Sequence, residues 1–153
     1  GPDIDRNGIL NETVIKPLAQ GKKANWLGSA DQKHSFTYTP DAAKATALLG
    51  NTDSAYGEVW HLPTAKNPPT GKQWVEMSAE LLGVKPKMQV APKWLVGVLG
   101  WVSPMMKELH EMVYQYDRPY DFSSDKFEKA FDFSPTSYNE GLKTTIYSDY
   151  GKK

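Results

Sequence analysis

The sequence predicts an α/β or α+β domain that is built mostly from helices, with a few short strands. Two observations predict this class. Apolar residues recur at helical spacing in several segments that begin at capping residues or end at glycine. Runs rich in aromatic and β-branched residues are short and scattered between those segments. With 153 residues, 39% of them apolar and 12% aromatic, the chain has the composition of an ordered domain.

The first expected helix covers residues 10–18. Val14 and Leu18 keep helical spacing, and Gly21 follows as a stop signal. Pro17 lies inside this segment and lacks the N–H that an interior helical residue donates. The segment therefore predicts a helix with a kink or an early end.

Short strands are expected at residues 24–27, 36–38, 58–62 and 87–90. The first two runs are separated by a polar stretch, so a β-ribbon is their simplest arrangement. The third run, Glu-Val-Trp-His-Leu, is closed by Pro63. Because about three or more strands are usually needed for an independently stable sheet, these few strands predict a sheet that lacks partners in this chain.

Capping residues predict further helices. Thr39 as N-cap, followed by proline and Asp41, predicts a helix through residue 49. Thr70 and Gln73 form a capping box for a helix that ends at Gly83. The remaining expected helices cover residues 92–101, 105–114 and 125–131, and a last one begins at the capping box of Ser137 and Glu140.

Charge and cysteine content exclude several classes of protein. The 18 basic residues balance 18 acidic residues, which argues against nucleic acid or an anionic membrane as a partner. The absence of cysteine excludes disulfides and thiolate metal sites, and favours the cytoplasm. The longest apolar segment, residues 94–106, is too short to span a membrane, so we expect it to fill the core or to cover a cleft.

The chain lacks the motifs of a complete catalytic or metal site. No Gly-rich phosphate loop and no Gly-x-Ser-x-Gly elbow occurs. His110-Glu111 resembles the start of a zinc motif, but Tyr114 stands where the second histidine would be needed. We therefore expect no metal and no catalytic residue in this chain.

Arginine is rare, since only Arg6 and Arg118 interrupt a basic set that is otherwise lysine. The planar guanidinium suits carboxylate or phosphate better than lysine does. Arg118 lies in the dense aromatic and charged turn of residues 116–120, which either lines a ligand site or packs a loop.

Three motifs in order resemble the C-terminal part of the extended short-chain dehydrogenases, the NAD-dependent epimerase/dehydratase family. They are Phe-Thr-Tyr-Thr-Pro-Asp-Ala-Ala at 36–43, Glu-Val-Trp-His-Leu-Pro at 58–63, and the run from Phe-Ser-Ser-Asp-Lys-Phe at 122–127 through Phe-Ser-Pro-Thr at 133–136 to Glu-Gly-Leu at 140–142. The resemblance covers nearly the whole chain. It implies that residues 1–153 are the substrate-binding lobe, without the N-terminal Rossmann core.

The same resemblance implies where hydride chemistry is located. Gly1-Pro2 is similar to the Gly-Pro that follows the family's catalytic Tyr-x-x-x-Lys, and no Tyr of this chain has a Lys four residues on. The catalytic pair and the loop that binds NAD or NADP would then lie upstream. The fragment alone is expected to be inactive, and its first partner would be its own missing Rossmann domain.

Family resemblance also assigns the candidate site residues. It places Pro2 near the nicotinamide ring and Asn11 and Trp26 at a small-molecule substrate, with Arg118 at the anionic part of a nucleotide-sugar. His34 stands where nucleotide-sugar epimerases usually carry a second arginine. This departure leaves two roles open for His34, a weaker phosphate donor or a structural residue, and it favours other hydroxyl or carbonyl substrates as well.

Two functional hypotheses follow. As a fragment of an NAD(P)-dependent epimerase, dehydratase or reductase, the chain would expose an apolar face where the Rossmann domain docks, and self-association would cover that face. As a self-standing binding or interaction module with no catalytic role, it would be a well-folded monomer without such a face.

Overall fold

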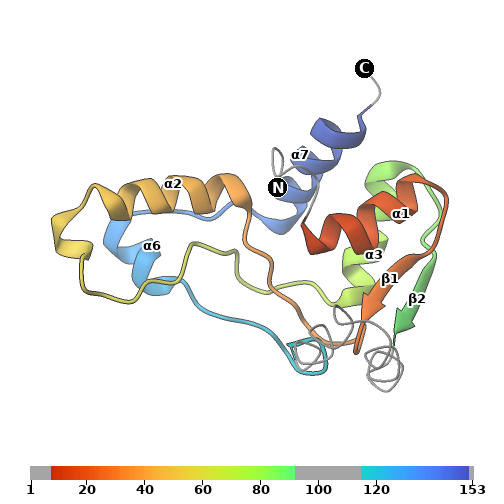
Figure 1. Ribbon diagram of the computed structural model, residues 1–153, viewed down its shortest axis with the longest axis horizontal. Coiled ribbons are helices and arrows are strands. Elements are labelled where there is room, and N and C mark those ends of the chain that lie inside the picture. The colour runs from red at the N-terminus through yellow and green to blue at the C-terminus, as the bar shows by residue number, and fades with distance from the viewer. Residues whose placement is uncertain (1–7, 92–114, 152–153) are drawn as a thin grey trace, which may run out of the picture. The chain divides into compact units, whose positions relative to one another are not determined.

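The computed structural model describes residues 8–91 and 115–151 (Figure 1). These residues divide into two compact units. Unit 1 contains residues 35–68 and 121–151, and unit 2 contains residues 8–34, 69–91 and 115–120. The helices expected at 92–101 and 105–114, and the apolar segment 94–106, lie outside the described residues.

Unit 2 combines a two-stranded parallel sheet with helices. Its elements are the π-helical turn η1 (Asn11–Ile15), α1 (Lys16–Ala19), β1 (Ala24–Leu27), α3 (Gly71–Leu82) and β2 (Met88–Ala91). Figure 1 shows β1 and β2 side by side, and their register pairs Ala24 with Met88 and Leu27 with Ala91. The apolar side chains of η1 and α1 pack on β1 and α3, and Val14 and Leu18 are almost fully buried.

The expected ribbon between residues 24–27 and 36–38 is wrong. The first segment is β1, but it pairs in parallel with β2, and the second segment forms no strand. Residue Gly28, with φ of 66°, ends β1, and the chain then continues irregularly to two isolated bridges, Lys33 with Thr70 and His34 with Tyr120. A parallel pair needs a long crossover, and α3 lies within that crossover.

The local helix signals of unit 2 are confirmed. The Thr70 hydroxyl accepts from the Gln73 N–H while the Gln73 side chain accepts from the Thr70 N–H, and Gly83 ends α3 in the left-handed region. Pro17 does not end the first helix. The preceding turn is π-helical, with the Lys16 N–H bonded to the Asn11 carbonyl, and this wider turn admits the proline at the start of α1.

Unit 1 is helical in its described residues. Its elements are α2 (Thr39–Gly50), the 3-10 turn η2 (Asp53–Ala55), α6 (Asp125–Phe131) and α7 (Tyr138–Tyr150). The helices were predicted, but α2 begins one residue early, with Tyr38 as its N-cap. The Ser137 hydroxyl accepts from the Glu140 N–H as expected. Phe127, Leu142 and Ile146 are buried in this unit.

The strand expected at residues 58–62 is wrong. This segment pairs with no other strand among the residues that the structure describes. Side chains hold it instead, because the Lys126 ammonium donates to the Val59 carbonyl at 3.0 Å and the His61 Nδ1 lies 2.9 Å from the Ser123 carbonyl. Val59 itself is 81% exposed. The β-favouring composition of this run is therefore not matched by a strand partner.

Across residues 8–91 and 115–151, no helix has both the length and the apolar character required to cross a bilayer.

Candidate functional site

An aromatic cluster surrounds His34 in unit 2. We call Trp26, His34, Tyr116 and Tyr120 the His34 cluster. The imidazole stacks on Tyr116 with ring centroids 4.4 Å apart, and on Tyr120 with centroids 4.9 Å apart. The Trp26 indole meets the imidazole edge at 6.3 Å. Two of the residues that the sequence assigned to a substrate site, Trp26 and His34, are thus neighbours in the fold.

His34 is held by both its backbone and its ring. Its N–H donates to the Pro69 carbonyl at 3.0 Å, and its own carbonyl accepts from the Trp74 indole, also at 3.0 Å. Only 5% of the residue is exposed. Burial lowers the pKa of His34 to about 4, and a hydrogen bond to the backbone of Gln115 opposes this shift. The imidazole is therefore neutral at pH 7.

Trp26 is packed inside the unit. It is 3% exposed, and its indole nitrogen donates to the Ser29 carbonyl at 3.3 Å. Gly71, the first residue of α3, lies directly against the indole, where a Cβ would come within 2.6 Å of the ring nitrogen. The absence of a side chain at Gly71 is what allows α3 to begin there. Trp26 therefore packs edge-on against the His34 imidazole and offers little surface to a ligand.

Arg118 lies on an anchored loop. The Tyr116 carbonyl accepts from the Ser29 N–H at 3.1 Å, and the Tyr120 N–H donates to the Lys33 carbonyl at 2.9 Å. Between these two anchors Arg118 is exposed, whereas Tyr116 is 8% exposed. The His34 cluster thus fixes both ends of the loop that presents the guanidinium.

The other two assigned residues are placed differently. Asn11 opens η1 and is 6% exposed, so it is part of the packed interior of unit 2. Pro2 lies outside the described residues. The sequence-based assignment missed Tyr116 and Tyr120 as members of the cluster. Their dense aromatic turn was visible in the sequence, but the stacking on His34 is a long-range contact that no local pattern encodes.

The described residues do not fit a dinucleotide cofactor. A Rossmann phosphate site needs a Gly-rich turn between a strand and a helix. Here β1 is followed by Gly28, but an irregular segment comes next, and a Cβ on Gly28 would lie 2.8 Å from the Asp117 carboxylate. A carboxylate at that place would repel a diphosphate. Nor do the described residues contain a group of three His, Cys, Asp or Glu side chains that could hold a metal ion.

Comparison with solved structures identifies the fold. The dTDP-glucose 4,6-dehydratase of Bacillus anthracis, in complex with NAD, matches 98% of this chain with a TM-score of 0.71 and 19% identity. The UDP-glucuronic acid 4-epimerase of Bacillus cereus, also in complex with NAD, matches 97% with a TM-score of 0.67 and 17% identity. The chain has part of the fold of an extended short-chain dehydrogenase.

This dehydrogenase-like fold confirms the fold class that the sequence predicts. At 19% and 17% identity, the likeness concerns the fold alone. The chain spans 42% of the length of the dehydratase and 40% of the length of the epimerase. No protein-family model matches the sequence, and no curated protein matches it either.

Proposed function

We propose that this chain is the substrate-binding portion of an NAD(P)-dependent oxidoreductase of the epimerase/dehydratase type, inactive by itself, that acts on a sugar nucleotide or a related hydroxyl or carbonyl compound. One observation carries the proposal. Nearly the whole chain matches two sugar-nucleotide enzymes that were crystallised with NAD, yet it spans only about two fifths of each. NAD or NADP binding is assigned to the domain that the fragment lacks, with Pro2 as the contact from this chain.

Arg118 is the residue we assign to the anionic part of the substrate. Its guanidinium is exposed, while its loop is tied to the Ser29 and Lys33 backbone at both ends. A forked donor on a fixed loop can bind a phosphate with two parallel hydrogen bonds and loses little conformational entropy on binding. The assignment of an anionic group to the substrate therefore rests mainly on Arg118.

We assign His34 and Trp26 to the support of that site, because both rings pack against Tyr116 of the Arg118 loop. Asn11, the other predicted substrate residue of unit 2, is buried in η1. His34 is neutral at pH 7 because burial lowers its pKa to about 4. A neutral, buried imidazole is a weaker phosphate donor than the arginine that nucleotide-sugar epimerases usually carry at this place. This favours substrates that demand less charge neutralisation than a full nucleoside diphosphate.

The segment at residues 58–62, which forms no strand, supports the proposal that a neighbouring domain is absent. Its composition favours a strand, its Val59 side chain is 81% exposed, and no strand pairs with it among the described residues. Leu48 and Tyr56 of the same unit are also exposed. An absent nucleotide-binding domain would cover such a segment by supplying a strand partner.

Cofactor titration of the isolated chain tests the proposal. Calorimetric titration with NAD and with NADP is expected to show no saturable binding below about millimolar concentration, since the described residues lack the phosphate loop. Saturable micromolar binding by the 153-residue chain would overturn the proposal.

The coding sequence upstream of residue 1 gives an independent test. The proposal expects a Gly-x-x-Gly-x-x-Gly loop and a Tyr-x-x-x-Lys pair there. Sedimentation velocity, combined with binding of a dye that reports exposed apolar surface, should show an exposed apolar face or self-association. A monomer that binds no dye, from a gene without those motifs, would instead indicate a self-standing binding module.

A further inference from the structure

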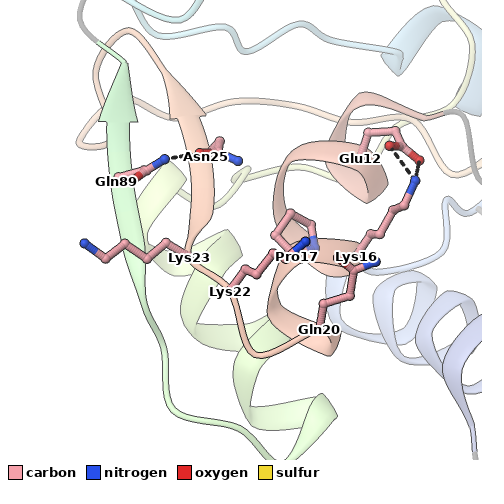
Figure 2. Close-up of a pocket in the computed structure, with 8 residues that line it drawn as sticks. All are labelled: Glu12, Lys16, Pro17, Gln20, Lys22, Lys23, Asn25 and Gln89. Atoms are coloured by element: carbon pink, nitrogen blue, oxygen red, sulfur yellow. Dashed lines mark hydrogen bonds and ion pairs between the residues drawn. The ribbon is translucent and has the colours of Figure 1, made fainter.

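The lysines of this chain differ in what their ammonium groups contact. In unit 2, Lys16 pairs with Glu12 four residues earlier, and Lys22 and Lys23 point away from each other (Figure 2). The ammonium of Lys126, in unit 1, instead contacts three consecutive residues of a segment that is distant in the sequence. Lys126 therefore does more than solvate the surface.

Each contact of Lys126 is made to a different kind of group in residues 58–60. Its Nζ donates to the Glu58 carboxylate at 2.8 Å and to the Val59 carbonyl at 3.0 Å. The same ammonium lies over the Trp60 ring, 4.2 Å from the ring centroid. Because a lysine ammonium combines three N–H donors with a charge that aromatic rings attract, it can serve all these groups together. The ammonium thus covers the backbone of the segment at Val59.

Helix α6 holds Lys126 in this position. Phe127, the next residue of the helix, is fully buried, and its ring meets the Trp60 indole edge-on with centroids 6.2 Å apart. Just before the helix, the Ser124 hydroxyl accepts from the Thr64 N–H at 3.0 Å. The helix and the segment are therefore joined at further points, and Lys126 loses little additional conformational freedom when it makes its contacts.

The backbone that Lys126 covers is otherwise unprotected. No N–H of residues 58–62 donates to a backbone group of the described residues, and the Val59 side chain is 81% exposed. The composition of this run favours a strand. Such a run, with unpaired N–H and C=O groups, is a template for pairing with another chain, and natural proteins place lysines at strand edges to prevent it. Lys126 is a lysine at such a place.

A second copy of the chain supplies a segment that matches this one. In an antiparallel pair of the two segments centred on Trp60, Glu58 would lie opposite an uncharged leucine, so that no like charges face each other. Val59 would lie opposite His61 of the second copy. Its carbonyl would then accept from that histidine's N–H. In the present structure the Lys126 ammonium occupies this carbonyl.

We propose that Lys126 caps residues 58–62 and prevents them from pairing with the same residues of a second copy of the chain. The ammonium occupies the Val59 carbonyl, binds the Glu58 carboxylate and keeps the segment against α6. Removal of the ammonium uncovers this edge of the segment. The inference does not rest on the proposed function, because it concerns the 153-residue chain with no other domain beside it.

Sedimentation velocity of Lys126→Met over a concentration series tests the proposal. Methionine keeps an unbranched apolar side chain and removes the charge and every donor. The variant should dimerise about tenfold or more tightly than the original protein. Hydrogen exchange in the dimer should slow at the Val59 and His61 amides, which the new pairing protects. An unchanged dimer affinity would overturn the proposal.

Two further variants separate the cap from general effects. Lys129→Met makes the same substitution at an exposed position of the same helix and should leave dimerisation unchanged. Equal dimerisation of both methionine variants would reduce the effect to a general gain in apolar surface, and the proposal would fail.

Adding Val59→Pro to Lys126→Met removes an N–H that the pairing needs, and should return the dimer affinity to that of the original protein. A dimer that survives the proline would form elsewhere on the surface, which also overturns the proposal. Circular dichroism shows whether each variant is folded, and Lys126→Gln takes the place of Lys126→Met if that variant unfolds.

Discussion

The imidazole of His34 lies flat against the phenol ring of Tyr116, with centroids 4.4 Å apart and planes 9° apart. This contact joins the segment that leads out of unit 2 to the loop that presents Arg118. It also explains why His34 is neutral, because stacking and burial remove the water that would solvate an imidazolium.

The stability of the protein should fall as the pH falls from about 6.5 to about 4. His34 has its pKa lowered from 6.5 to about 4 in the folded state, so in this window the unfolded chain binds more protons. By linkage, the contribution at pH 4.5 is a loss of about 2–3 kcal/mol relative to pH 7.5. Urea unfolding at the two pH values measures it.

His34→Phe should show a smaller loss of stability between those pH values, since the titrating group is gone. His61→Gln is the matched control, because His61 is exposed, and it should retain the pH dependence of the original protein. If His34→Phe and the original protein lose the same free energy of unfolding between pH 7.5 and 4.5, the burial argument for His34 fails.

Gly71→Ala should destabilise the protein by about 1–3 kcal/mol, because the added methyl group would overlap the Trp26 indole. Tryptophan fluorescence during thermal unfolding would report the loss as a lower Tm. Gly50→Ala is the control, since a Cβ there meets nothing within 4 Å. That variant should be neutral or slightly more stable, and an equal loss in both variants would contradict the packing argument.

Asp41→Ala should cost about 1–3 kcal/mol, since a buried, charge-assisted contact is lost. The Asp41 carboxylate accepts from the Thr136 N–H at 2.7 Å and from the Thr136 hydroxyl at 3.0 Å, and so joins α2 to the segment before α7. Asp53→Ala, at an exposed position, is expected to change the free energy of unfolding by less than about 0.5 kcal/mol. A double-mutant cycle of Asp41→Ala with Thr136→Val should reveal a coupling free energy between the two side chains. Purely additive losses would contradict this interaction.

Trp60→Leu should destabilise unit 1 by about 1–2 kcal/mol, because the indole packs edge-on against Phe131 and lies beneath the Lys126 ammonium at 4.2 Å. Glu58→Gln removes only the exposed ion pair with Lys126, so no measurable change in the urea midpoint is expected. A midpoint that shifts as much in Glu58→Gln as in Trp60→Leu would show that the ion pair, and not the ring, holds this segment.

The sequence predicts those parts of the fold that adjacent residues encode. The capping box of Thr70 and Gln73, the end of α3 at Gly83 and the cap of α7 at Ser137 were all predictable, because each motif is completed within about one helical turn. The prediction at Pro17 was only partly correct. The sequence indicates that the proline lacks an N–H, but it does not indicate the π-helical turn that accommodates the proline.

The strands and the candidate site depended on contacts between distant segments. The aromatic run at 24–27 was recognisable as a strand, yet its partner is β2 and not the nearby run at 36–38. The residues at 58–62 have a strand's composition but no strand partner among the described residues. Strand propensity describes how a side chain fits a pleated surface, and it does not specify which surface is available.

By itself the sequence therefore determined the balanced charge, the helices of the described residues and most of their ends, whereas the substrate role of Trp26, His34 and Arg118 stays a prediction from family resemblance. Only the tertiary structure decided that Trp26 and His34 are buried against each other and that Tyr116 and Tyr120 hold the loop of Arg118. The physical reason is how far apart in the sequence the interacting residues lie. Helix caps and helical periodicity are satisfied within a few residues, whereas burial, ring stacking and a lowered pKa arise only when segments far apart in the chain exclude water from one another.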